Sequence, residues 1–207
     1  MSATETDPLN QLLKQHFGHD DFRPQQRAII DDAVAGRDVF VILPTGGGKS
    51  LCYQLPALAD GSGTTVVISP LIALMQNQVD LLTANGIPAT FLNSTLDLDE
   101  LYQREQDAIA GRYRLVYMAP ERLMAAPGRA LLMRLNVSRF AIDEAHCISE
   151  WGHDFRPEYR MMGELRRGFD GKFRDTPLMA LTATATPRVA DDIVRELQLR
   201  DPARHQG

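Results

Sequence analysis

Short apolar runs alternate with stretches of helical periodicity along most of this chain. The runs occupy 39–43, 64–68, 89–92, 114–118, 137–142 and 177–181. Because most positions in each run are apolar, we expect both faces to be covered, which is typical of parallel strands buried between helices. The segments between the runs predict helices at 49–59, 71–85, 97–110, 157–169 and 187–198. This alternation predicts an α/β domain with a central, mostly parallel sheet flanked by helices.

The first 38 residues follow a different pattern and predict a helical N-terminal extension. Asp7 and Pro8 form a helix-start signal. Apolar residues then recur at helical spacing, at Leu9, Leu12, Leu13 and Phe17. Pro24 begins a second helix. We therefore expect an extension at 1–38 and one α/β domain at 39–207, since nothing in the composition marks a further boundary.

The composition is that of an ordinary globular protein. The 207 residues are 44% hydrophobic and 24% charged, which excludes disorder as the main state, and the apolar runs are too short to cross a bilayer. Two cysteines, Cys52 and Cys147, cannot form a disulfide framework or a four-ligand structural zinc site, so we expect no zinc. With no basic flank and no apolar core at its N-terminus, we expect no secretory signal. We expect a cytoplasmic protein, associated with the nucleoid in a bacterial cell, with no membrane partner.

A glycine-rich segment follows the first apolar run. It consists of Thr45, Gly46, Gly47, Gly48, Lys49 and Ser50. A strand, a glycine turn and a helix in this order predict a phosphate-binding loop, whose backbone N–H groups and helix N-terminus surround phosphate oxygens. Lys49 would reach the β- and γ-phosphates, and the Ser50 hydroxyl would bind Mg²⁺. A glycine run alone more often forms only a turn, but the Lys-Ser ending after an apolar strand favours ATP and Mg²⁺ as cofactors.

Two adjacent carboxylates, Asp143 and Glu144, end the run at 137–142. They are expected at the carboxyl edge of the sheet, where α/β folds bind ligands. Asp143 could hold Mg²⁺, and Glu144 could take the proton from an attacking water. The alternative is that the two acids only stabilise the N-terminus of a helix through its dipole. A phosphate-binding loop in the same chain makes this alternative less consistent with the sequence.

The last run leads into a segment rich in small hydroxyl residues, at 182–187. Its threonines could hydrogen-bond the carboxylates or a γ-phosphate. Equally, Thr186 could cap the helix that Pro187 begins. The residues alone leave both interpretations open.

An aromatic segment with one glycine follows the carboxylates at 149–157. Its candidate DNA-sensing residues are Trp151, His153, Phe155 and Arg156. Aromatic and arginine side chains in a loop provide a stacking surface for unpaired bases. The alternative is that Trp151 and Phe155 pack inward. The formal net charge of −5 argues only weakly against nucleic acid, because the local field at the binding face decides.

Together, these motifs resemble those of the RecQ family of superfamily 2 DNA helicases. The resemblance covers the first of their two RecA-like motor domains and includes 17–26, 69–78, 93–95, 119–123, 143–146 and 182–184. It implies a RecA-like P-loop NTPase fold. The segment at 151–157 distinguishes this family from RNA helicases with the same Asp-Glu-Ala-His sequence.

The resemblance also implies residue roles. Adenine would be bound by His19, Arg23 and Gln26, with His19 stacking where relatives often have another aromatic ring. The residues implied in hydrolysis are Lys49, Asp143 and Glu144. Those implied in sensing single-stranded DNA are Trp151, His153, Phe155 and Arg156.

The implied function is that of an ATP-dependent 3′–5′ DNA helicase, monomeric and acting on single-stranded and partly duplex DNA. Family members carry a second RecA-like domain in cis that supplies an arginine finger, worth ~10³–10⁵ in rate. This chain ends before such a domain, so we expect it to bind ATP, hydrolyse it slowly and not unwind DNA alone. The alternatives are a nucleic-acid-binding module with negligible turnover and a P-loop ATPase or kinase for a small molecule, which would leave the aromatic segment unexplained.

Overall fold

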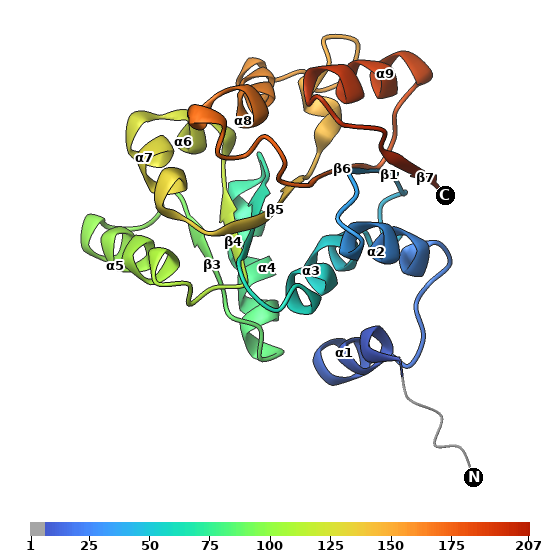
Figure 1. Cartoon of the computed structure of the whole chain (residues 1–207), viewed down its shortest axis with the longest axis horizontal. Helices are drawn as coiled ribbons and strands as arrows, with labels where there is room; N and C mark the ends of the chain where they lie inside the picture. The colour runs from blue at the N-terminus through green and yellow to red at the C-terminus, as the bar shows by residue number, and fades with distance from the viewer. Residues whose placement is uncertain (1–6) are drawn as a thin grey trace.

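The computed structural model describes residues 7–207, in which seven strands form one sheet between two helical layers (Figure 1). The strands are β1 (Val39–Ile42), β2 (Thr64–Ile68), β3 (Ala89–Leu92), β4 (Leu115–Met118), β5 (Val137–Ile142), β6 (Leu178–Thr182) and β7 (Ala203–Gln206). Their spatial order is β3-β4-β2-β5-β6-β1-β7, and each pairing is parallel. The α/β fold and the six predicted strands are confirmed.

Helices cover both faces of the sheet. The α-helices are α1 (Pro8–Phe17), α2 (Gln26–Val34), α3 (Lys49–Ala59), α4 (Ile72–Ala84), α5 (Leu98–Ile109), α6 (Pro120–Met124), α7 (Ala126–Arg134), α8 (Glu164–Arg167) and α9 (Pro187–Glu196). Three 3₁₀ segments add η1 (Ala145–Ile148), η2 (Pro157–Gly163) and η3 (Phe169–Gly171). Within residues 7–207, no helix is long and apolar enough to cross a bilayer.

Alternation along the strands divides the core into two layers. In β1, Val39 and Val41 pack with α2, α3 and α4, whereas Phe40 packs with the layer of α5 to α9. These strands are buried on both faces, as expected for a parallel sheet. Outside the first layer, Leu13 of α1 packs against Ile30 and Leu55. The described part of the extension, 7–38, therefore carries two helices as predicted and packs directly on the α/β body. Residues 1–6 of the predicted extension lie outside the described residues.

Three segments differ from the sequence prediction. The helix expected at 157–169 is instead η2, α8 and the start of η3. The chain leaves helical geometry at Gly168, which has φ of −90° and ψ of −159°. The short helices α6 and α7 were not predicted. Nor was β7, which pairs with β1 after the last helix.

A buried ion pair connects the chain segments at the amino-terminal edge of the sheet. Asp38, just before β1, accepts hydrogen bonds from both terminal nitrogens of Arg166, each at 2.7 Å. The same carboxylate accepts from the backbone N–H of Leu178 at 3.0 Å and of Arg200 at 2.6 Å. Both charged side chains are 4% exposed. This network joins the starts of β1 and β6, at the edge of the sheet opposite the one where the glycine-rich loop follows β1.

Candidate nucleotide and nucleic-acid site

A cavity of about 730 Å³ opens at the carboxyl edge of the sheet. Its lining includes the end of the glycine-rich loop after β1, the carboxylates after β5 and the N-terminal half of α4. Residues that line it include Arg23, Gly46, Gly48, Lys49, Ser50, Tyr53, Gln78, Tyr117, Asp143 and Glu144. The parallel sheet therefore brings together the two motifs that the sequence placed about 95 residues apart, at the edge expected for ligand binding.

The glycine-rich loop is built from backbone conformations that favour glycine. Gly46 and Gly48 both have φ of +81°, and a side chain on Gly48 would collide with the amide nitrogen of Gln26. Gly47 N–H donates to Pro44 O at 2.8 Å. Lys49 Nζ donates to Leu43 O at 3.2 Å, so the ammonium lies across the loop and beside the cavity.

Two of the three residues predicted to bind adenine, Arg23 and Gln26, lie in the N-terminal extension and hydrogen-bond the glycine-rich loop. Arg23 lines the cavity and its guanidinium donates to Gly46 O. Gln26 is buried; its Oε1 accepts from Arg23 N–H at 2.7 Å, and its Nε2 donates to Gly48 O at 3.2 Å. His19 is exposed and does not line the cavity. Contact of these residues with adenine stays a prediction.

Asp143 lines the cavity and is only partly exposed. Burial, with a smaller effect from the neighbouring Glu144 charge, raises the pKa of Asp143 to about 6. Glu144 N–H donates to Asp143 Oδ1 at 2.9 Å. Glu144 itself has φ of +51°, ψ of +41°, a left-handed conformation that is unfavourable for a residue other than glycine. This turn points two adjacent carboxylates toward one cavity.

His146 connects Glu144 to the end of β6. Its Nδ1 lies 2.8 Å from Thr182 Oγ1 and 3.5 Å from Glu144 Oε2. Burial lowers the pKa of His146, which favours the neutral form of its ring. Thr186 meanwhile caps α9 by accepting from Val189 N–H at 3.3 Å. The capping interpretation is therefore confirmed for Thr186. Thr182 bonds the histidine of the carboxylate motif rather than a carboxylate, and contact of a threonine with a γ-phosphate stays a prediction.

The aromatic segment lies on the surface beside these carboxylates. Trp151 is 57% exposed, and the Arg188 guanidinium lies 3.3 Å from its ring centroid. His153 stacks on His146 with centroids 4.5 Å apart, while Phe155 is half-buried. The inward-packing alternative is therefore wrong for Trp151.

Sequence reasoning missed a polar cluster beneath the glycine-rich loop. Gln54 Nε2 donates to Gln78 Oε1 at 3.0 Å and to the Tyr117 hydroxyl at 3.2 Å. The Tyr53 and Tyr117 hydroxyls are 3.4 Å apart, and burial raises the pKa of Tyr117 to about 12. These residues belong to α3, α4 and β4 and come together only in the folded sheet, so no spacing along the chain could reveal them.

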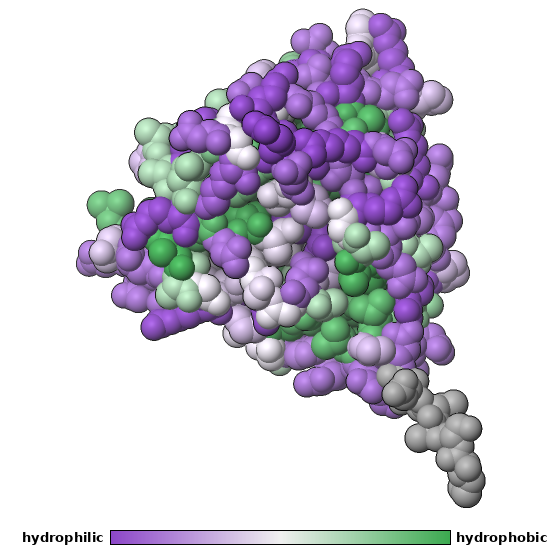
Figure 2. Space-filling view, in the orientation of Figure 1, coloured by the Kyte–Doolittle hydropathy of each residue, from purple (hydrophilic) through white to green (hydrophobic). Residues whose placement is uncertain are grey.

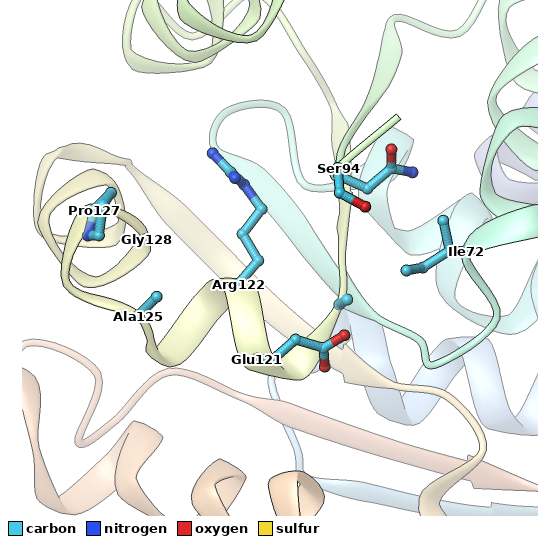
Figure 3. Close-up of a pocket in the computed structure, with 9 residues that line it drawn as sticks. Ile72, Ser94, Glu121, Arg122, Ala125, Pro127 and Gly128 are labelled. Carbon is cyan, nitrogen blue, oxygen red and sulfur yellow. The ribbon is translucent and has the colours of Figure 1, made fainter. Parts of the chain in front are cut away.

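A second, smaller cavity of about 230 Å³ lies near the ends of β3 and β4. Ile72, Ser94 and Glu121 line it, and Arg122 extends alongside (Figure 3). Arg122 pairs with Glu105 at 2.6 Å. The segments at 93–95 and 119–123, which are part of the resemblance to RecQ helicases, thus lie on one surface.

The donor set at the large cavity fits a magnesium nucleotide. Lys49 supplies a cation, the loop supplies backbone N–H groups, and Ser50 with Asp143 supplies oxygen ligands of the kind that Mg²⁺ prefers. A raised pKa on a buried carboxyl is also the condition that a bound cation would relieve.

Fold and site together define a RecA-like P-loop nucleotide-binding domain. Residues 23–193 match the family model described as DEAD/DEAH box helicase, and the chain belongs to this family. It is 48% identical over 196 residues to the ATP-dependent DNA helicase RecQ of Haemophilus influenzae, covering 95% of this chain and 31% of that protein. It is 49% identical over 191 residues to RecQ of Bacillus subtilis, covering 91% and 32%. The resemblance to RecQ helicases is confirmed, and the chain spans about a third of these relatives.

The fold agrees with solved helicase structures. A hypothetical ATP-dependent RNA helicase from Sulfolobus tokodaii superposes with a TM-score of 0.72 at 18% identity, over 96% of this chain and 56% of that one. At that identity the likeness establishes the RecA-like fold and nothing about the nucleic acid bound.

Proposed function

We propose that this chain is the first motor domain of an ATP-dependent DNA helicase of 3′–5′ polarity. The observation that carries the proposal is the connection between the nucleotide cavity and the exposed aromatic segment. Glu144 lies 3.5 Å from His146, and the His146 ring stacks on His153. The names of the RecQ relatives support DNA as the nucleic acid; the polarity comes from the family resemblance.

On the nucleotide side, the residues have separate tasks. Lys49 balances phosphate charge, and the loop N–H groups orient the phosphate chain. Ser50 and Asp143 would hold Mg²⁺, which when bound neutralises charge that develops on the phosphate oxygens. Glu144 would accept the proton of the attacking water, since its side chain is 27% exposed and reaches the cavity.

On the DNA side, Trp151 offers a ring face to an unpaired base. Stacking of one base on an aromatic side chain is worth about 1–3 kcal/mol, enough to displace Arg188 from an exposed cation–π contact of about 0.5–1 kcal/mol. A base that moves the segment also moves His153 against His146. Because His146 contacts Glu144, DNA binding would reposition the general base.

Hydrolysis by the chain alone is proposed to be slow. Arg23 lines the cavity but is bonded to the loop, so an arginine from a second RecA-like domain in cis would supply the missing transition-state charge. We further propose a monomer in the cytoplasm, near the nucleoid in a bacterium. On the face shown in Figure 2, hydrophobic side chains form separate patches among hydrophilic ones.

ATP turnover with and without single-stranded DNA tests the proposal, at a stated low salt concentration because phosphate contacts weaken with salt. We expect slow turnover, stimulation by DNA and no unwinding. Trp151→Ala should reduce the stimulation, whereas Tyr102→Ala, which removes an aromatic ring of similar exposure on α5, should not. Equal loss in both variants, or stimulation that survives Trp151→Ala, would contradict the role of the aromatic segment. Nucleotide binding without turnover under any condition would instead favour a binding module.

A further inference from the structure

Three side chains of metal-binding type meet behind Glu144, outside the nucleotide cavity. One ligand atom from each of His146, Cys147 and Asp154 lies within 4.8 Å of the other two. His146 and Cys147 are buried in η1, whereas Asp154 is half-exposed and belongs to the aromatic segment. The group therefore joins the carboxylate motif to the surface that we propose binds DNA.

The spacing fits a tetrahedral ion. Cys147 Sγ lies 3.7 Å from Asp154 Oδ2. Zinc–sulfur and zinc–oxygen bonds of about 2.3 and 2.0 Å at a tetrahedral angle put the two ligand atoms ~3.5 Å apart. An ion would therefore require only a small adjustment of these two side chains.

The hydrogen bonds around His146 leave the lone pair of its Nε2 atom free to bind a metal ion. Thr182 Oγ1 donates its single proton to Thr184 O at 3.2 Å. It must therefore accept from His146 Nδ1–H, 2.8 Å away. A neutral ring protonated at Nδ1 carries its lone pair on Nε2, and this second-shell bond is the kind that orients histidine ligands in metal sites.

Charged side chains lie next to the three candidate ligands. Arg156 Nη2 lies 3.3 Å from Asp154 Oδ2, and Glu144 lies on the Nδ1 side of His146. An ion would replace the weak contact between thiol and carboxylate, and its charge would compete with Arg156 for Asp154. A thiolate and an imidazole select a borderline or soft cation over Mg²⁺, which prefers oxygen ligands.

We propose that His146, Cys147 and Asp154 bind a divalent transition-metal ion of the zinc class, with water as the fourth ligand. The thiol proton is released to solvent on binding. The bound ion fixes the segment at 151–157 to the turn that carries Glu144. This site has three protein ligands and an open position, so it differs from the four-ligand structural zinc site that the cysteine count excluded.

Cobalt provides a direct probe, because a thiolate bound to tetrahedral Co²⁺ gives a charge-transfer absorption band. The chain is freed of metal with a chelator, supplied with excess Mg²⁺ and titrated with Co²⁺, then with Zn²⁺. We expect the band to appear and Zn²⁺ to abolish it. Cys147→Ala should remove the band, and Asp154→Asn should weaken Co²⁺ affinity about tenfold or more. Cys52→Ala, which removes the other buried thiol, is the matched control and should keep the band.

Fluorescence of Trp151, the one tryptophan in the sequence, reports on the segment itself. Zn²⁺ should raise its anisotropy in the unmodified chain and in Cys52→Ala but not in Asp154→Asn, whose partly exposed position makes it safe for folding. Absence of a thiolate band in the unmodified chain, or a band that persists in Cys147→Ala, would overturn the site. Binding without a change at Trp151 would overturn the fixing of the segment. Neither readout depends on ATP turnover.

Discussion

Replacing Asp143 by asparagine should stabilise the magnesium-free protein at neutral pH. Burial raises the pKa of Asp143 from 3.8 to about 6, so the folded state disfavours its charge. The folded pKa exceeds the unfolded one by roughly two, and a difference of one in pKa corresponds to about 1.4 kcal/mol. Above pH 6, the charge on Asp143 therefore lowers the free energy of unfolding by at most about 3 kcal/mol. Asparagine carries no charge, and its Oδ1 can still accept from Glu144 N–H.

The pH dependence follows from the sign of that pKa change. Because the folded pKa lies above the unfolded one, the folded state binds the proton more tightly, and the wild-type chain loses stability as the pH rises from about 4 to 6. The advantage of Asp143→Asn should therefore be about 3 kcal/mol at pH 8, about 1.5 kcal/mol at pH 5 and small at pH 4.

Urea unfolding of both proteins at these three pH values, without Mg²⁺, measures the difference in free energy of unfolding. Subtracting wild type from variant at each pH cancels the titration of every other group. The reasoning would be refuted if the variant were less stable than wild type at pH 8. It would also be refuted if the stability gained by the variant were the same at pH 8 and pH 4, because the folded state would then not disfavour the charge on Asp143.

Three further substitutions test other parts of the structure. Glu144→Gln should keep ATP affinity, measured by fluorescent-nucleotide binding, and reduce turnover to background; unchanged turnover would exclude Glu144 as the general base. Arg166→Met should lower the free energy of unfolding by about 3 kcal/mol, because Asp38 stays buried without its ion-pair partner; a loss below about 1 kcal/mol in urea unfolding would contradict that network. Gly48→Ala should weaken nucleotide binding at least about tenfold, because a left-handed residue and the collision with Gln26 distort the loop; unaltered affinity would contradict this explanation.

The sequence predicts well those parts of the fold whose signal is local. The run at 137–142 is mostly apolar and is followed by two acids, so both the strand and the placement of Asp143 at its end follow from one pattern. The glycine-rich loop is equally local. By contrast, β7 at 203–206 carries mostly polar residues, Arg204, His205 and Gln206, and is a strand only because the free edge of β1 accepts it.

Contacts between distant segments were the part of the site that the sequence could not predict. Nothing in the order of residues indicates that Thr182 will hydrogen-bond His146, since β5 and β6 become neighbours only through the sheet order. The exposure of Trp151 was also undecided, because an aromatic residue in a loop packs inward or outward according to the body beneath it. The roles at the adenine end, which rest on the resemblance, remain predictions for His19 in particular.

The edge strand β7 has a mechanical consequence. Residues 203–206 run parallel to β1, Gly207 N–H donates to Ile42 O at 3.0 Å, and Gln206 O accepts from Gln25 at 2.9 Å. A pull on residue 207 along the strand axis would load all of these bonds together in shear rather than one after another. Tension applied at this point would therefore reach the strand that leads into the phosphate loop, and the turn before α2, before the sheet edge gives way.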